Sequence, residues 1–209
     1  MPMTMCSPRI LLAGGGLWLL ACAGCATVDQ KIGLAYSPVD RSFGRHSGQL
    51  AVQRAEPERP APRNGRGEWI IGPLTNVHGV RQADLLADRS LGEWVTEALM
   101  LELKQAGFSV SQVSPASPGV AGGMVISDIN ASVSISKGLI SDEARQEIRF
   151  TIDLYRDGVK LKSFGVASRD NRVYPFAASR TDQEKALVQS LQDAMKQVMP
   201  EIVTLFGSR

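Results

Sequence analysis

The chain is poor in cysteine, and the cysteine it has lies at one end. Its 209 residues include three cysteines, Cys6, Cys22 and Cys25, all within the first 25 positions. The rest of the chain can therefore form neither a disulfide framework nor a cysteine-ligated metal site. Only two histidines are present, and we interpret both His46 and His78 as solvated loop residues. The sequence thus predicts no metal site and no cofactor, and a fold that depends on its apolar core.

An excess of charge of either sign is also absent. Lys and Arg total 23, against 21 Asp and Glu. Domains that bind nucleic acid usually carry a basic patch or a high isoelectric point, so this balance gives no electrostatic reason to expect a nucleic-acid partner. The N-terminal apolar run "ILLAGGGLWLLA" is also too short to span a bilayer, which takes roughly 20 residues.

That run has the three parts of an export signal. Arg9 is the only charged residue before it, and small residues surround the two cysteines that follow it. A basic start, a short apolar middle and a small-residue end are the pattern of a secretory signal peptide. We therefore expect the domain that follows to work outside the cytoplasm.

Two cysteines, Cys22 and Cys25, compete for the end of the signal. Signal peptides that end at a cysteine resemble those of bacterial lipoproteins, in which Leu stands three residues before the lipidated cysteine and Ala or Gly directly before it. Cys22 has Leu19 and Ala21 in these places, whereas Cys25 follows Ala23-Gly24 but has Cys22 where Leu belongs. Lipidation of Cys22 would leave Cys25 as an odd thiol in an oxidising compartment, which slightly favours Cys25. The signal peptide is 1–24 for Cys25, or 1–21 for Cys22.

The resemblance to lipoproteins also implies an address. Such proteins carry more than one acyl chain, and two or more chains anchor a protein stably. The residue after the modified cysteine is Ala26 or Ala23, and neither is the Asp that retains lipoproteins in the inner membrane. The resemblance therefore implies a lipid anchor on the periplasmic face of the outer membrane.

Beyond the anchor, the sequence predicts a flexible tether over 25–47 and one domain over 48–206. The first firm element is a helix, because Ser90 and Glu93 form a capping box ahead of an apolar stripe that ends near Gly107. A second helix is expected near the C-terminus, with Thr181 and Glu184 as its capping box. Pro200 should kink or split this second helix.

Alternating apolar and polar residues predict an antiparallel meander over about 123–169. The stretch "MVISDINASVSIS" is expected to bury Val125, Ile129, Ala131, Val133 and Ile135 on one face. A second alternation buries Ile148, Phe150, Ile152 and Leu154, and Asp157-Gly158 then forms a type I′ turn. The predicted class is α+β, a mostly antiparallel sheet of about 5–6 strands with two amphipathic helices on one face.

The order of these parts resembles the YajG-like family of bacterial lipoproteins. The resemblance rests on the lipoprotein signal, the helix "LGEWVTEALMLELKQAGFSV", the strand "GGMVISDINASVSISKG" and the hairpin "RFTIDLYRDGVKLKSFG", and it covers about residues 45–205. More loosely, the layout is similar to the auxiliary lipoproteins of ABC-type transporters. These resemblances imply a small envelope lipoprotein, and no functional residue is carried over.

No catalytic residues are predicted. "SISK", Ser134 to Lys137, matches the S-x-x-K pair of penicillin-binding proteins, but that motif belongs on a helix, where residues three apart share a face. Here it ends an alternating strand, and its partner motifs are missing. We therefore predict a non-catalytic lipoprotein that is anchored to a membrane and meets a protein partner in the envelope. The alternative is a protein that binds a lipid, glycan or peptide in a groove between helices and sheet.

Overall fold

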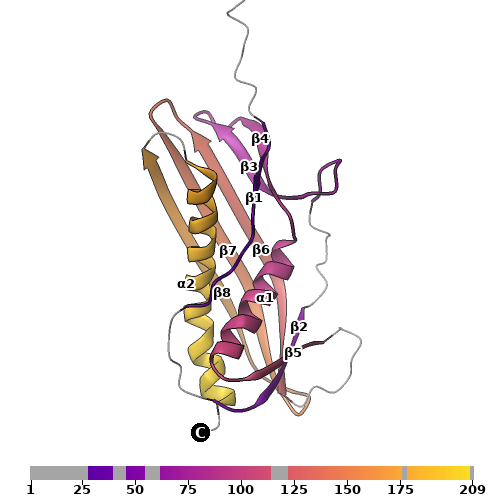
Figure 1. Cartoon of the computed structure of the whole chain (residues 1–209). Helices are drawn as coiled ribbons and strands as arrows, with labels where there is room; N and C mark the ends of the chain where they lie inside the picture. Colours follow the sequence, from indigo (N-terminus) through magenta and orange to yellow (C-terminus); the bar gives the residue numbers. More distant parts are fainter. Residues whose placement is uncertain (1–27, 40–45, 55–61, 114–121, 176–177, 208–209) are drawn as a thin grey trace, which may run out of the picture.

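The fold is α+β, as predicted (Figure 1). The computed structural model describes residues 28–39, 46–54, 62–113, 122–175 and 178–207. The strands in these residues are β1 (Gln30–Ile32), β2 (Gln49–Arg54), β3 (Trp69–Asn76), β4 (Arg81–Ala87), β5 (Ser109–Val113), β6 (Gly122–Lys137), β7 (Ser141–Arg156) and β8 (Val159–Pro175). The helices are α1 (Leu91–Gln105) and α2 (Arg180–Phe206), and both lie on one face of the sheet.

The strands in the described ranges form one 8-stranded sheet that mixes parallel and antiparallel pairs. Strand β6 pairs with antiparallel β7 on one edge, and β7 pairs with antiparallel β8. The other edge of β6 is shared by β2 and β3, both parallel to it. The prediction of a mostly antiparallel sheet of about 5–6 strands is therefore wrong in direction and in number. Alternation reveals that a strand has one buried face, but not the direction of its neighbour.

Helix α1 begins at the predicted cap. The Ser90 side chain accepts a hydrogen bond from the Glu93 backbone N–H at 3.1 Å, and the Glu93 carboxylate accepts one from the Ser90 N–H at 3.3 Å. This reciprocal pair satisfies two N–H groups that have no partner within the helix. The predicted stripe packs into the core, where its fully buried side chains include Trp94, Val95, Leu99 and Leu103.

Helix α2 begins before the predicted cap. Ser179 accepts from the Asp182 N–H at 3.2 Å, and the Asp182 carboxylate accepts from the Ser179 N–H at 3.3 Å. The predicted box of Thr181 and Glu184 is therefore wrong, because both residues lie inside the helix. Both the Ser179–Asp182 pair and the Thr181–Glu184 pair fit the capping pattern in the sequence, and the helix begins at the earlier pair.

Helix α2 also continues through Pro200, so the proline does not split it. Pro200 is exposed, and Lys196, whose carbonyl an N–H at position 200 would otherwise bind, is only half-buried. The apolar stripe therefore stays on one side of the helix over its whole length. Its fully buried residues include Leu187, Leu191, Met195, Val198 and Ile202.

A bulge at Asp128 divides β6 into two halves. Asp128 has a φ of 52°, and the register with β7 shifts between Ser127 and Asn130. One extra residue reverses the side to which later residues point. Val125, predicted to share the buried side, instead lies opposite Asp153 and is only half-buried. The inward residues are Met124 and Ile126 before the bulge, and Ile129, Ala131, Val133 and Ile135 after it.

The hairpin of β7 and β8 follows the prediction closely at its turn. Asp157 and Gly158 have φ values of 51° and 78°, the positive values that a type I′ turn requires. The four apolar residues predicted to be buried on β7 are all buried. Strand β8 extends past the predicted end near 169, because its pairing with β7 continues to Pro175.

Residues 33–39, here called the strap, run between α1 and α2 (Figure 1). On the α2 side, the Gly33 N–H donates to Glu184 at 2.7 Å, and the Gln192 amide donates to the Ser37 carbonyl at 2.8 Å. The strap and β1 lie within the range predicted to be a flexible tether. In the structure this part of the range is packed, and Ile32 and Leu34 are buried in the core.

On the α1 side, the strap is held by one buried carboxylate. Glu102 is only 1% exposed, and it accepts hydrogen bonds from the Tyr36 hydroxyl and from the Val39 N–H, the latter at 2.7 Å. Burial, together with the hydrogen bond to Glu102, raises the pKa of Tyr36 far above its ordinary value. The strap thus closes the seam between the two helices with both polar and apolar contacts.

Candidate functional site

The side of β6, β7 and β8 that faces away from the helices, here called the outer face, gathers polar side chains in rows. Register places Ser134, Arg145 and Asn171 in one row across the three strands. The next row is Ser132, Glu147 and Arg169. Because side chains alternate along each strand, every second residue of β7 faces this way. In the first half of β7 these residues are Glu143, Arg145, Glu147 and Arg149.

Arginine neighbours hold the carboxylates of this face in the ionised state. Glu147 accepts hydrogen bonds from Arg169 and Arg149. These two contacts lower the pKa of Glu147, the Arg169 bond having the larger effect. Glu143 accepts from Arg145 at 3.0 Å, and this bond, followed by one with Asn171, lowers the pKa of Glu143. The outer face is therefore charged at neutral pH, with the two signs interleaved.

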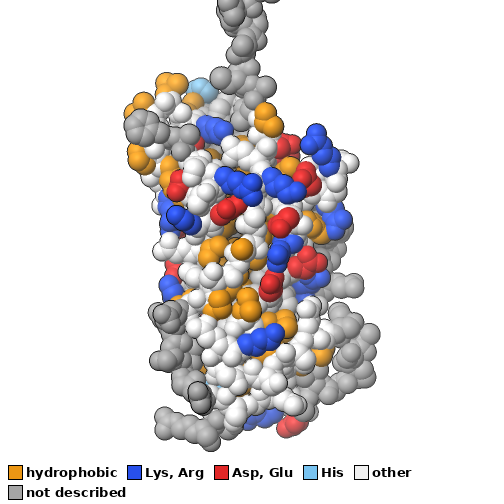
Figure 2. Space-filling model, viewed as in Figure 1, with side chains coloured by type: hydrophobic (Ala, Val, Ile, Leu, Met, Phe, Trp, Pro, Cys, Tyr) orange, Lys and Arg blue, Asp and Glu red, His pale blue; other side chains and the backbone are white. Residues whose placement is uncertain are grey.

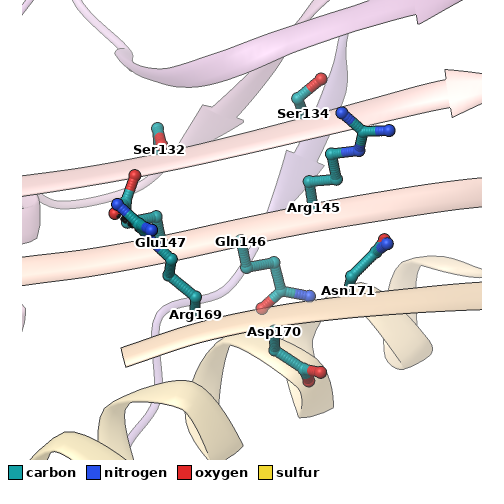
Figure 3. A pocket seen from close by; sticks show the side chains of 8 residues that line it. All are labelled: Ser132, Ser134, Arg145, Gln146, Glu147, Arg169, Asp170 and Asn171. Atoms are coloured by element: carbon teal, nitrogen blue, oxygen red, sulfur yellow. Dashed lines mark hydrogen bonds and ion pairs between the residues drawn. The ribbon is translucent and has the colours of Figure 1, made fainter. Parts of the chain in front are cut away.

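Two open hollows lie in the sheet, with volumes of about 350 and 360 Å³. The first is lined by Ser132, Ser134, Arg145, Gln146, Glu147, Arg169, Asp170 and Asn171 (Figure 3). The second is lined by Asp128, Asn130, Arg149, Phe150, Thr151, Gly165, Val166 and Ala167. Figure 3 shows Ser134 and Arg145 pointing away from α2, whereas Gln146 and Asp170 point toward it. Gln146 is buried there and accepts from the Ser190 hydroxyl at 3.4 Å.

The arrangement is suited to hydrogen bonding more than to bond breaking. Ser134 lies opposite Arg145 in the register, and a guanidinium cannot act as a general base because it stays protonated. Lys137 lies three residues from Ser134 on β6, so the S-x-x-K match is in a strand. What the face offers is hydroxyl groups, arginine donors and paired carboxylates on a broad surface.

The other predicted site residues lie elsewhere. Cys22 and Cys25, the candidate lipid anchors, are outside the described residues, so their role stays a prediction. His78 is exposed in the turn between β3 and β4, as expected. His46, in contrast, is half-buried and its ring stacks on Phe108 with centroids 5.9 Å apart, so the prediction of a solvated loop residue is wrong for it.

The described ranges contain neither a metal-binding cluster nor a helix that could span a membrane. No group of three or more His, Cys, Asp or Glu side chains in them is placed to hold a metal ion. In the same ranges, neither helix combines the length and the apolar character needed to cross a membrane.

These features define an α+β domain with one covered and one open sheet face. No family model and no curated protein matches the chain. Among solved structures, it is similar to a Xanthomonas campestris protein assigned to DUF330, with 14% identity, a TM-score of 0.44, and coverage of 85% of this chain and 96% of that one.

Two further solved structures are similar at the same low level. One is described as a neuraminyllactose-binding hemagglutinin homolog from Helicobacter pylori, with 13% identity, a TM-score of 0.42, and coverage of 79% and 91% of the two chains. The other is a minor lipoprotein from Acinetobacter baumannii, with 11% identity, a TM-score of 0.40, and coverage of 75% and 90%. Identities and TM-scores this low define neither a family nor a function for this chain.

Proposed function

We propose that this protein is a non-catalytic lipoprotein of the cell envelope that binds a protein partner through its outer face. The observation that carries the proposal is the contrast across the sheet: both helices cover one side, and no described element covers the other over β6 to β8. The hollows of the outer face are open, which suits a broad surface contact. Arginine, of which this face has several, is enriched in protein interfaces.

The anchor is proposed to be Cys25, or Cys22, on the periplasmic side of the outer membrane. Replacing the lipidated cysteine, by Cys25→Ala or Cys22→Ala, should release the protein from the membrane fraction because the acyl chains are lost. Metabolic labelling with palmitate measures the loss of the acyl chains, and membrane fractionation measures the release of the protein. Labelling that persists in each single variant and in the double variant would contradict the anchor.

The partner contact is tested by crosslinking in intact cells. A photoreactive amino acid at Asn171 or Ser132, both exposed on the outer face, should give a defined crosslinked product. Lys185 is the matched control, because it is also exposed but lies on α2. Mass spectrometry of the product identifies the partner. Equal products from all three positions, or none from any, would contradict a partner bound at the outer face.

The strap counts against the alternative of a ligand held between helices and sheet. Its residues already occupy the seam between α1 and α2, where Leu34 is buried and Tyr36 is hydrogen-bonded. The two hollows described above are lined by β6, β7 and β8, and no helix residue lines either.

A further inference from the structure

Two turns lie side by side at one end of the sheet. Strand β3 runs parallel to β6, with Asn76 paired with Lys137, so the chain leaves both strands at the same end. The turn between β3 and β4 is residues 77–80, and the turn between β6 and β7 is residues 138–140. We call these two turns together the tip.

The tip exposes apolar side chains that a folded domain usually buries. Leu139 is 101% exposed and Ile140 is 83% exposed, while Val77 and Val80 are 59% and 55% exposed. The two turns, "VHGV" and "GLI", contain no acidic residue, no lysine and no arginine. Figure 2 shows hydrophobic side chains gathered at this end, with a histidine beside them. Exposed apolar groups that cluster in this way mark an interaction surface.

The N-terminal side of the chain leaves the domain at the same end. Strand β1 runs parallel to β4 and away from the tip, with Gln30 paired with Leu85. Asp29 also accepts a hydrogen bond from the Asp84 N–H at 2.8 Å. Val28 therefore lies beside β4, about two residues, or about 7 Å, along that strand from the end next to the tip.

This position limits the distance between the tip and a lipid anchor. Cys25 is three positions before Val28 in the sequence, and a fully extended chain spans at most about 3.5 Å per residue, so the two residues are at most about 10 Å apart. For Cys22 the limit is about 20 Å. On either reading, the tip can reach the bilayer that holds the anchor.

We propose that the tip inserts into the lipid bilayer to which the chain is anchored, so that Leu139 and Ile140 lie at the boundary between headgroups and acyl chains. The inference rests on the lipid anchor of the proposed function. It adds a second membrane contact, which fixes the orientation of the sheet. Apolar turns that contain no acidic residue, lysine or arginine suit this boundary, where apolar groups lie about 5–10 Å below the surface.

The far end of the same hairpin gives a matched control. Strand β7 has 16 residues, so the turn after it lies about 50 Å from Leu139. Val159, just after that turn, is also apolar and 63% exposed. The tip and the control position are thus both exposed and apolar, but they lie at different distances from the anchor.

The test uses the full lipidated protein in vesicles of phosphatidylethanolamine and phosphatidylglycerol. Leu139→Cys and Val159→Cys are each labelled with a fluorophore, in a background where the non-lipidated one of Cys22 and Cys25 is alanine. Nitroxide groups on the acyl chains should roughly halve the emission at position 139, because the label lies at their boundary, and should leave position 159 unchanged. Adding Ile140→Asp should reduce the quenching at 139 while the protein still floats with the vesicles.

Two results would overturn the inference, and they differ in what else they overturn. Equal quenching at positions 139 and 159 in protein that floats with the vesicles means that the tip does not insert, although the anchor holds. Protein that does not float lacks the anchor, and the proposed function fails with the inference. A protein partner at the tip would appear as emission at 139 that the nitroxide lipids do not quench.

Discussion

The two faces of the sheet differ in how their polar groups are satisfied. On the inner face, Glu102 is buried, and its hydrogen bonds join the strap to α1. On the outer face, Glu147 is bound by Arg149 and Arg169 while all three remain accessible to water. A buried polar group costs free energy when it loses its partner, whereas an accessible group exchanges it for water. The polar contacts of the inner face therefore stabilise the fold, whereas the polar groups of the outer face can exchange their hydrogen-bond partners at little cost in free energy.

The sharpest test of this difference introduces one charge on each face. Leu99→Asp should unfold the domain, at a cost of more than about 4 kcal/mol, because an unpaired charge would replace a fully buried side chain. Ala167→Asp, its control on the outer face, should change stability by no more than about 0.5 kcal/mol, because Ala167 is exposed and lies opposite Arg149. Thermal unfolding followed by circular dichroism distinguishes the two. A cooperative melt of wild-type midpoint for Leu99→Asp would show that α1 is not packed as described.

Removing the carboxylate under the strap should have the next largest effect. Glu102→Ala leaves the Tyr36 hydroxyl and the Val39 N–H without their acceptor, and should destabilise the domain by about 3 kcal/mol. Urea denaturation measures the loss, and limited proteolysis should show faster cleavage within the strap. If cleavage accelerates equally in all loops, the variant has loosened the whole domain and the strap does not act as a unit.

A smaller change on the same contact depends on pH. Tyr36→Phe should cost about 1.5 kcal/mol at neutral pH by removing the hydrogen bond to the Glu102 side chain. The pKa of Tyr36 in the folded state lies above its ordinary value of 10.0, so this contribution is fully present below pH 10.0 and is lost as the pH rises toward the folded-state value. Urea unfolding of both proteins should show a wild-type advantage that shrinks above pH 10.0. A constant difference would mean that the hydroxyl is not buried.

The smallest effect is expected on the outer face. Arg169→Gln removes the stronger of the two hydrogen bonds that lower the pKa of Glu147, so this pKa should rise toward its ordinary value. The contribution of the ionised carboxylate is present above the unfolded-state pKa and is lost as the pH falls through the folded-state value. Carboxyl carbon NMR titration measures the change. An unchanged midpoint would show that Arg149 alone sets the pKa of Glu147.

Much of the outer face follows from the sequence. The alternation in β7 predicts correctly which side chains are buried, and Asp157-Gly158 predicts the turn that brings β8 beside it. The contact of Arg169 with Glu147 could not be predicted, since the exact register across the hairpin includes an irregularity between Leu154 and Tyr155. A shift of one residue would have turned Arg169 to the other face.

Long-range contacts account for the remaining differences. The sequence does not indicate the bulge at Asp128, because neither glycine nor proline occupies that position. The bulge places Val125 on the side opposite to the predicted one. The longer stretch 26–47, which includes the strap, has few apolar residues at either the helical or the strand period, so it is predicted as a tether. The place of the strap is set by Glu102 and Glu184, which lie 63 to 151 positions away in the sequence. Patterns within one segment cannot predict such contacts.

The strap also determines when the fold is complete. Gly33 and Glu184 are 151 positions apart, and Ser37 and Gln192 are 155 apart. A chain is synthesised from its N-terminus, so the strap is made among the first residues of the domain and α2 among the last. The strap must therefore wait, without its α2 partners, until nearly the entire chain has been made. Folding of this domain can finish only after α2 has been synthesised, and a chain that ends before α2 would leave the strap open to proteases.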